Sequence, residues 1–372
     1  MRVLMTGGGT GGHVNPAIAI ANTIKENLPD SVIEYVGTSK GIEDRLVSRA
    51  GYKMHHVEIR GIKRSLSPSN IKTAYYILTA PGKAKKLIKE FKPDIVIGTG
   101  GYACWPTVKA AAEMGIPTAL HESNAVPGVA IKALASKVDR IYVNFEKAAE
   151  AFPDSSKVLH VGNPLMSQFA KIDKDDARRK IGIPESCRYV LLSYGGSLGA
   201  EKVNDAMLSF MKNTLAKHPE IYHIHATGSS SYAGVKERFE AEGLNDLPNV
   251  ELAEYIYDMP LRMAAADVVV CRAGAMTVSE LSLSGKCAVF IPSPNVTNNH
   301  QYKNAKVLSD EGAALLFTES EIDGDFELKL SKLLSSEGDA ERAEMEKQIS
   351  GFAVPDANRR IFEDIIKLVG KK

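Results

Sequence analysis

Residues able to bind a nucleotide follow one apolar run in the second half of the chain. Residues 267–270 (DVVV) are typical of a buried parallel strand, and residues 271–276 (CRAGAM) lead directly into a helical pattern. A helix that begins at a strand end presents free backbone N–H groups, which bind phosphate well. Glu280 lies about two turns into this helix, where its carboxylate can accept hydrogen bonds from both hydroxyls of a ribose. The stretch predicts a nucleotide site, although an ordinary strand–helix turn would contain the same small residues.

A second candidate site is the glycine-rich segment 7–13 (GGGTGGH), which follows the apolar run 3–5. Glycine allows the backbone to approach a ligand closely. The glycines at 7, 9 and 12 match G-x-G-x-x-G and Glu34 lies near the place of the ribose acid, so a nicotinamide dinucleotide site stays open. His13 stands where a phosphate-loop NTPase has lysine, which disfavours that class. The segment therefore predicts a loop for an anion or a sugar.

Two polar residues at strand ends are candidates for chemistry. We expect His13 to point into a ligand crevice, either as a general base near neutral pH or as a donor that orients a hydroxyl or phosphate. Asn124 follows the expected strand 118–121, and its amide suits a sugar hydroxyl. His121 and Glu122 precede it and are expected to be buried behind the site. The amide side chains within residues 298–301 could bind sugar hydroxyls, or they could equally cap the helix that follows.

These motifs need a scaffold of alternating strands and helices, and the chain supplies that pattern twice. In the first half we expect strands at 3–5, 32–36, 56–59, 94–98, 118–121, 140–143 and 158–161, and in the second half at 189–193, 222–226, 250–253, 267–270 and 288–291. Such alternation indicates parallel sheets. The predicted α/β fold has two Rossmann-like, doubly wound domains facing a central cleft, with the ligands in that cleft. The expected domains are 1–163 and 164–345, followed by C-terminal helices at 346–372 that cross back to the N-terminal domain.

Composition excludes several classes of protein. The 372 residues carry a formal charge of +1, so there is no global basic field of the kind that binds nucleic acid. The four cysteines lie far apart without metal-ligand spacing, which fits a reduced cytosolic setting. Asp173-x-Asp175 and Asp323-x-Asp325 lie in polar linker or turn sequence, so we expect helix caps and no metal site. No apolar run is long enough to span a membrane.

A lysine-rich amphipathic stretch spans residues 69–89. Ile71, Tyr75 and Leu78 recur at helical spacing, and lysines including Lys72 surround them. An apolar stripe ringed by lysines suits an anionic membrane surface. The same stripe could instead pack against the protein's own sheet.

The motifs taken together resemble the MurG-type N-acetylglucosaminyltransferases of glycosyltransferase family 28. The resemblance covers nearly the whole chain, through residues 7–13, 98–102, 121–124, 162–164, 195–200, 272–280 and 300–302. It implies a GT-B fold and inverting transfer of N-acetylglucosamine from UDP-N-acetylglucosamine to the 4-hydroxyl of the muramoyl sugar of lipid I. The product is lipid II, used in peptidoglycan synthesis and hence in cell shape and division. The resemblance also implies a peripheral enzyme on the cytoplasmic face of the cell membrane.

The resemblance also assigns roles to particular residues. The C-terminal domain would bind the donor: Gly196, Ser197 and Leu198 at the diphosphate, the Ile256 backbone at uracil, Glu280 at the ribose, and Arg272, Gly274, Ala275, Met276 and Thr277 at the phosphates. Asn124 and Gln301 would hold the sugar, and Thr10, Gly11 and Gly12 would close over it. His13 is the candidate base, with Asn124 and Glu280 completing the catalytic set. Met166 stands where the family has a donor-binding Arg, and His300 where it has a second Gln.

The resemblance implies no cofactor besides the donor substrate, and it leaves open a stimulation by Mg²⁺ and contacts with other cell-wall synthesis proteins. Three other functions remain open at this point. One is a UDP-sugar transferase acting on diacylglycerol, and another is a nucleotide-sugar epimerase, which needs no acceptor. A nicotinamide-binding regulator is the non-enzymatic option.

Overall fold

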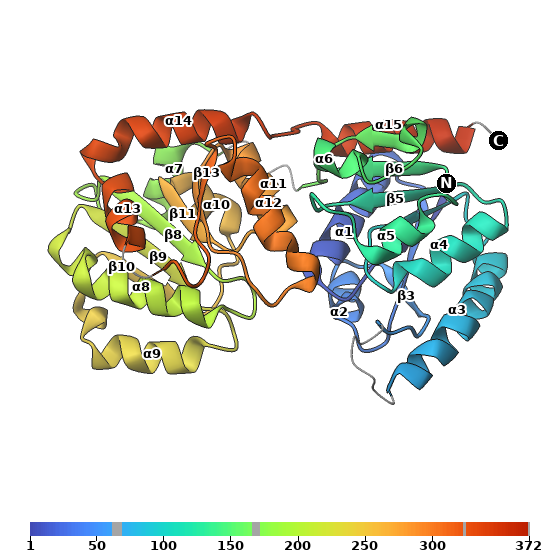
Figure 1. Ribbon diagram of the computed structural model, residues 1–372, viewed down its shortest axis with the longest axis horizontal. Coiled ribbons are helices and arrows are strands. Elements are labelled where there is room, and N and C mark those ends of the chain that lie inside the picture. Colours follow the sequence, from blue (N-terminus) through green and yellow to red (C-terminus); the bar gives the residue numbers. More distant parts are fainter. Residues whose placement is uncertain (62–68, 166–171, 323–324, 371–372) are drawn as a thin grey trace. The chain divides into compact units, whose positions relative to one another are not determined.

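The computed structural model describes residues 1–61, 69–165, 172–322 and 325–370 (Figure 1). The chain folds into two compact units. Unit 1 comprises Met1–Leu165 together with Asp356–Lys372, and unit 2 comprises Met166–Pro355. None of the described helices combines the length and apolar content that crossing a membrane requires.

The described part of unit 1 contains a seven-stranded parallel sheet. Its spatial order is β3-β2-β1-β4-β5-β6-β7, so the order reverses between β1 and β4. In sheets of this kind the ligand crevice lies at the carboxyl ends of the strands at that reversal, the switch point. The strands are β1 (Arg2–Thr6), β2 (Val32–Gly37), β3 (Lys53–His56), β4 (Ile95–Gly98), β5 (Thr118–Glu122), β6 (Arg140–Val143) and β7 (Val158–His160).

Helices cover both faces of this sheet because each strand has apolar side chains on both sides. On one face Met5 and Ile97 pack against Ile20 and Ile24 of the first helix. On the other face Leu4 belongs to a second buried cluster. The helices are α1 (Gly11–Asn27), α2 (Ile42–Arg49), α3 (Ser69–Phe91), α4 (Cys104–Glu113), α5 (Val129–Leu134), α6 (Glu146–Ala149) and α15 (Ala357–Gly370).

The C-terminal helix α15 is part of unit 1 although its sequence follows unit 2. Its Ile361 and Ile365 are buried in the cluster that contains α1. Asp364 accepts hydrogen bonds from Arg140 Nε at 2.8 Å and from the Tyr142 hydroxyl at 2.9 Å. Apolar burial and this partly buried ion pair fix the helix to unit 1.

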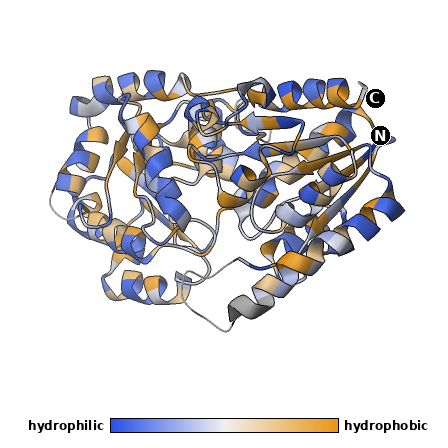
Figure 2. Ribbon diagram, turned by 45° about the vertical axis from the view of Figure 1, so that its right-hand side comes forward, coloured by the Kyte–Doolittle hydropathy of each residue, from blue (hydrophilic) through white to orange (hydrophobic). Residues whose placement is uncertain are grey.

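Unit 2 repeats the same topology over its described residues. Its parallel strands lie in the order β10-β9-β8-β11-β12-β13, with the reversal between β8 and β11. Figure 2 shows hydrophobic residues concentrated along the strands of the two sheets. The strands are β8 (Tyr189–Tyr194), β9 (Ile221–Ala226), β10 (Val250–Ala253), β11 (Val268–Cys271), β12 (Cys287–Phe290) and β13 (Ala314–Leu316). The helices are α7 (Lys174–Ile181), α8 (Glu201–Asn213), α9 (Tyr232–Ala241), α10 (Met259–Ala265), α11 (Ala275–Ser284), α12 (His300–Ser309), α13 (Asp325–Leu333) and α14 (Asp339–Ser350).

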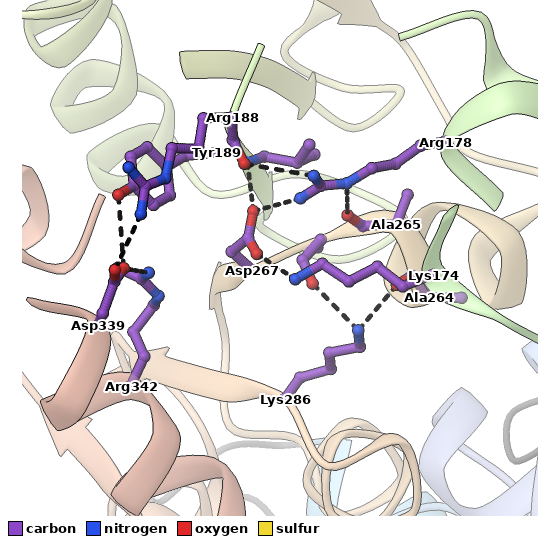
Figure 3. Close-up of polar contacts among 12 residues, drawn as sticks. Lys174, Arg178, Arg188, Tyr189, Ala264, Ala265, Asp267, Lys286, Asp339 and Arg342 are labelled. Carbon is purple, nitrogen blue, oxygen red and sulfur yellow. Dashed lines mark hydrogen bonds and ion pairs between the residues drawn. The ribbon is translucent and has the colours of Figure 1, made fainter. Parts of the chain in front are cut away.

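A polar network anchors the amino end of this sheet (Figure 3). Asp267 pairs with Lys174 and Arg178 of α7 and accepts a hydrogen bond from the Val190 N–H at 2.6 Å. Lys286 donates to the carbonyls of Ala264 and Ala266 at 2.8 and 3.0 Å. The network lies at the end of the sheet opposite the switch-point crevice, so we assign it to holding the strands and α7 together.

Three elements differ from the expected pattern. The third strand is Lys53–His56, not 56–59, because an edge strand tolerates polar side chains and the apolar Val57 and Ile59 instead enter the core beyond its end. The short strand β13 was not expected. Helix α14 belongs to unit 2, where its Met345 and Ile349 are buried, so residues 346–372 divide between the two units.

Candidate functional site

Two loops meet at the switch point of unit 2. Strands β8 and β11 end side by side, with Tyr194 opposite Cys271. The glycine loop 195–200 leaves the first strand and leads to α8, and residues 272–274 leave the second and lead to α11. Gly274 is the N-cap of α11 and provides no side-chain cap, and the first N–H groups of a helix have no partner within the helix. The predicted phosphate-binding residues 274–277 thus follow a strand at the switch point of unit 2.

The glycine loop 195–200 has a fixed shape. Ser229 and Ser230, in the loop after β9, donate their N–H groups to the carbonyls of Ser197 and Leu198 at 3.1 and 3.2 Å. Gly199 has φ +92°, and a Cβ there would lie 2.2 Å from the Thr227 carbonyl oxygen. The neighbouring loop therefore holds the predicted diphosphate residues in place.

Behind this loop lies a fully buried chain of polar groups that the sequence analysis did not find. Asn204 Nδ2 donates to the Thr227 carbonyl, so Asn204 Oδ1 must accept from His225 Nε2 at 3.1 Å. The Ser193 hydroxyl then donates to His225 Nδ1 and accepts from His223 Nε2, both at 2.7 Å. Burial lowers the pKa of His225 to about 4 and that of His223 further, so both rings are neutral. The chain supports the loop and has no exposed group for chemistry.

Glu280 lies in the second turn of α11. Its side chain makes no hydrogen bond or ion pair within the described ranges, and it is partly exposed. Desolvation by the surrounding protein raises the pKa of this carboxyl to about 7. Tyr194 and Cys271, at the ends of β8 and β11, both interact electrostatically with it. A carboxyl in this state is suited to accept hydrogen bonds from a ligand's hydroxyl groups.

Other predicted donor residues are held by the protein itself. Arg272 forms an ion pair with Glu319 at 2.5 Å and donates to the Ile291 carbonyl at 2.9 Å, so its charge is largely neutralised. Gln301 accepts a hydrogen bond from the Ser293 N–H at 2.8 Å and so fixes the loop after β12. Ile256 is buried in the loop after β10. Met166 lies outside the described residues.

The polar residues at the start of α12 turn the chain more than they cap the helix. Asn298 and Asn299 have φ of 57° and 53°, and the Asn299 side chain makes no cap hydrogen bond although it is the N-cap. His300 Nδ1 contacts the Thr297 carbonyl at 2.8 Å. The turn is therefore built into the backbone, and Gln301 follows it in the first turn of α12.

Unit 1 brings two glycine loops together at its own switch point. The Gly8 N–H donates to the Gly100 carbonyl at 3.2 Å, and a Cβ on Gly101 would lie 2.0 Å from the Gly8 carbonyl oxygen. His13 Nδ1 contacts the Thr99 carbonyl at 3.1 Å, and a carbonyl can only accept. The proton therefore sits on Nδ1, which leaves Nε2 as the acceptor nitrogen that a general base requires. Thr10, Gly11 and Gly12 form the start of α1 beside it.

A buried carboxylate that the sequence analysis missed holds this loop. Glu43 of α2 accepts hydrogen bonds from the Gly9 N–H at 3.0 Å and from the N–H and hydroxyl of Thr38 at 3.0 and 2.6 Å. These bonds outweigh desolvation and lower the pKa of Glu43. A Cβ at Gly8, Gly37 or Gly41 would lie 2.2 to 2.6 Å from its side chain. The only sequence signal was the concentration of glycines on either side of it.

Asn124 is oriented by its neighbour. Glu122 is 2% exposed, and its Oε1 accepts from the N–H and the amide nitrogen of Asn124 at 2.9 and 3.0 Å. His121 is also buried, with burial lowering its pKa to about 4. The expectation that His121 and Glu122 are buried behind the site is confirmed.

The nicotinamide interpretation of the first loop is not supported by Glu34. This residue lies in the middle of β2, paired with Leu4, whereas a ribose-binding acid belongs at the strand's carboxyl end. Its carboxylate is engaged by Lys53 and His55. Asp173 accepts from two N–H groups of α7 and is a helix cap. Asp323 lies outside the described residues, within which no cluster of metal-ligating side chains occurs.

On α3 the exposed face is the one predicted to meet a membrane. Tyr75 is 59% exposed and Leu78 is 81% exposed, whereas Ala80, Ala84 and Ile88 bury the opposite face in the core. The alternative that these two side chains pack on the protein's own sheet is therefore wrong. The side chains of Ile71 and Lys72 lie outside the described residues.

Comparison with known proteins identifies the class and the family to which this architecture belongs. Two Rossmann-type units in one chain, each with a glycine loop at its switch point, define the GT-B class of glycosyltransferases. Residues 3–143 match the glycosyltransferase family 28 N-terminal domain, and residues 190–361 match the family's C-terminal domain. The chain belongs to glycosyltransferase family 28.

Three proteins with full-length similarity illustrate the family. A protein from Acetivibrio thermocellus is named UDP-N-acetylglucosamine--N-acetylmuramyl-(pentapeptide) pyrophosphoryl-undecaprenol N-acetylglucosamine transferase. It is 40% identical over 376 residues, which cover 100% of this chain and 99% of the relative. A similarly named protein from Bacillus thuringiensis is 41% identical, with 100% of both chains covered. The crystal structure of MurG from Acinetobacter baumannii has a TM-score of 0.77 and 28% identity, covering 98% of this chain and 99% of that one.

Proposed function

We infer that this protein transfers N-acetylglucosamine from UDP-N-acetylglucosamine to lipid I and so forms lipid II. The full-length similarity to transferases of that name supports the reaction. The observation that carries the donor side is the crevice of unit 2. Glu280 stands there without a protein partner among the described residues, beside the uncapped start of α11. A carboxyl and a helix start together suit a ribose followed by phosphate.

The donor's diphosphate would bind at the helix starts and not at a free arginine. Because Arg272 is paired with Glu319, its net charge is small, and we propose that the N–H groups of Met276, Thr277 and the loop 196–198 bind the diphosphate. Such preorganised dipoles stabilise the charge that develops on the leaving diphosphate. Gln301 and Asn124, each fixed by a hydrogen bond within its own unit, would hold the sugar.

The reaction we propose is a single inverting displacement. The acceptor's 4-hydroxyl attacks the anomeric carbon, the bond to UDP breaks, and one proton must leave the attacking hydroxyl. His13 Nε2 would accept that proton, since Nδ1 is held protonated by the Thr99 carbonyl. Thr10, Gly11 and Gly12 would lie against the donor sugar. The chain's own residues supply this chemistry without a protein-bound cofactor.

We propose that unit 1 meets the membrane through α3, which would place the enzyme at the cytoplasmic membrane surface. Tyr75 and Leu78 are exposed apolar anchors, and Lys83 and Lys86 add positive charge on the same helix. Replacing Tyr75 and Leu78 with Ser is expected to abolish binding to anionic vesicles while activity on a short-chain acceptor is retained. Vesicle binding equal to that of the parent would contradict this role.

The test of the reaction is a radiolabelled transfer assay. The full chain is incubated with UDP-[¹⁴C]N-acetylglucosamine, with and without lipid I, and the product linkage is read by NMR. We expect label in a lipid product with a β-1,4 bond only when lipid I is present. Epimerised or hydrolysed donor without acceptor would favour an epimerase, and transfer to diacylglycerol would favour the glycolipid transferase. Glu280→Gln should abolish transfer, whereas Glu346→Gln, a matched partly buried carboxyl on α14, should not.

A further inference from the structure

One arginine joins the carboxyl ends of three neighbouring strands in unit 2. Arg272 directly follows β11, and its Nη1 group donates to the carbonyl of Ile291, the residue after β12, at 2.9 Å. Its Nη2 group pairs with Glu319, in the loop that follows β13, at 2.5 Å. Strands β11, β12 and β13 are adjacent in that order. The guanidinium therefore links three chain segments just beyond the ends of their strands.

Glu319 fixes the direction in which this guanidinium points. The side chains of Arg272 and Glu319 are 12% and 22% exposed, so water competes weakly for either charge. The N–H donors of an arginine lie in one rigid plane, so a partner on one nitrogen also determines where the other nitrogen points. Removing Glu319 would leave a partly buried charge that must seek another acceptor. The contact of Arg272 with the Ile291 carbonyl therefore depends on Glu319.

The Ile291 carbonyl is connected to Gln301 through a short and stiff segment. Pro292 follows Ile291, and both residues are buried. Proline fixes its own φ and restricts the residue before it, so the orientation of Ile291 determines that of Ser293. The Ser293 N–H lies 2.8 Å from Gln301 Oε1 and can only donate, so the amide oxygen of Gln301 is held here. The NH₂ group of Gln301 is thereby given one direction.

We propose that Glu319 is a positioning residue for the donor's sugar. It holds Arg272 on the Ile291 carbonyl, and the segment 291–293 then holds Gln301 with its NH₂ group ready to donate to a sugar oxygen. The inference rests on the proposed donor site, in which Gln301 holds the N-acetylglucosamine. It adds a residue outside the motifs that define that site, because Glu319 comes from the loop after β13.

The positioning is tested without a nucleotide. Glu319→Ala removes the carboxylate, whereas Glu319→Gln keeps an acceptor oxygen and removes only the charge. Hydrogen exchange of the Ser293 N–H, followed by NMR in the full-length protein, reports its bond to Gln301. We expect this exchange to be about tenfold faster in Glu319→Ala than in the parent, with a smaller increase in Glu319→Gln.

Asp339→Ala is the matched control, because it also deprives a largely buried arginine of unit 2 of a carboxylate. Asp339 pairs with Arg342, whose side chain is 9% exposed, and it accepts a hydrogen bond from the Tyr189 hydroxyl at 3.4 Å. Tyr189 is the first residue of β8, so this pair lies near the amino end of the sheet, away from the strand ends that Arg272 joins. The control should leave the Ser293 exchange unchanged.

A binding comparison tests the role toward the sugar. Glu319→Ala should weaken the binding of UDP-N-acetylglucosamine about fivefold to tenfold, as expected for the loss of one hydrogen bond. Binding of UDP, which lacks the N-acetylglucosamine, should weaken by less than about twofold. An unchanged Ser293 exchange in Glu319→Ala, equal exchange in Glu319→Ala and Asp339→Ala, or an equal loss of affinity for both nucleotides would overturn the inference. If Gln301→Ala loses no affinity for UDP-N-acetylglucosamine, the donor-site proposal fails, while the Ser293 exchange still decides whether Glu319 positions Gln301.

Discussion

Donor binding should release a proton from Glu280. The free protein holds this carboxyl with a pKa of about 7 because burial disfavours its charge. Two ribose hydroxyls that donate to the carboxylate would favour the ionised form, so the pKa must fall on binding. UDP-N-acetylglucosamine is the ligand of choice, because its diphosphate has no ionisation near neutral pH.

The expected change in donor affinity with pH follows from the fraction of Glu280 carboxyl groups that are ionised. With this pKa, roughly nine carboxyls in ten are ionised near pH 8 and roughly one in ten near pH 6. Affinity for UDP-N-acetylglucosamine should therefore fall about tenfold between these pH values, or about 1.4 kcal/mol. At pH 7 binding should release roughly half a proton.

Isothermal titration calorimetry in buffers of different ionisation enthalpy measures both quantities. Glu280→Gln should bind weakly at every pH and release no proton, and Glu346→Gln should behave as the parent. An affinity that is equal at pH 6 and pH 8, or a proton release that persists in Glu280→Gln, would refute the reasoning.

The raised pKa of Glu280 also makes the stability of the folded protein depend on pH. A raised folded-state pKa stabilises the fold fully below pH 4.5, and this contribution is lost as the pH rises through about 7. Glu280→Gln should therefore raise the Tm more at pH 8 than at pH 5.

Three further predictions concern unit 1. His13→Ala should lower kcat about 10²- to 10⁴-fold with little change in the acceptor KM if His13 is the base; a raised KM with nearly normal kcat would assign it to acceptor binding. Glu43→Gln places an NH₂ group against donors from Gly9 or Thr38, so kcat/KM for the acceptor should fall about tenfold, whereas donor affinity should stay normal. Glu34→Gln, whose partners are Lys53 and His55, is its control, and equal losses in both variants would argue against a loop-specific effect. Asp364→Ala leaves the partly buried Arg140 unpaired and should destabilise unit 1 by about 2 kcal/mol, seen as faster hydrogen exchange in α15 and α1. Asp356→Asn, at an exposed ion pair, should have little effect, and normal protection in Asp364→Ala would contradict the anchoring role.

Much of the fold could be predicted from the sequence because the apolar runs of its central strands are a strong signal. Apolar runs such as residues 189–193 and 267–270 predicted buried parallel strands, and both are strands in the structure. The edge elements were less predictable: the strand at Lys53–His56 is polar, and β13 is only three residues long. Edge strands are stabilised by pairing with one neighbour more than by burial, so hydrophobic periodicity does not mark them.

The sequence alone predicted which residues follow the carboxyl ends of the strands at the two switch points. Glycine loops and the Arg272–Glu280 stretch directly follow apolar strands, and parallel strands bring their carboxyl ends to one edge whatever the details of packing. Only the tertiary structure decided how these residues are supported and charged. The pairing of Arg272 with Glu319 and the contact of Glu43 with Gly9 join residues distant in sequence. Charge state and hydrogen bonding depend on burial and on neighbours in space, and neither is encoded in the spacing of residues along the chain.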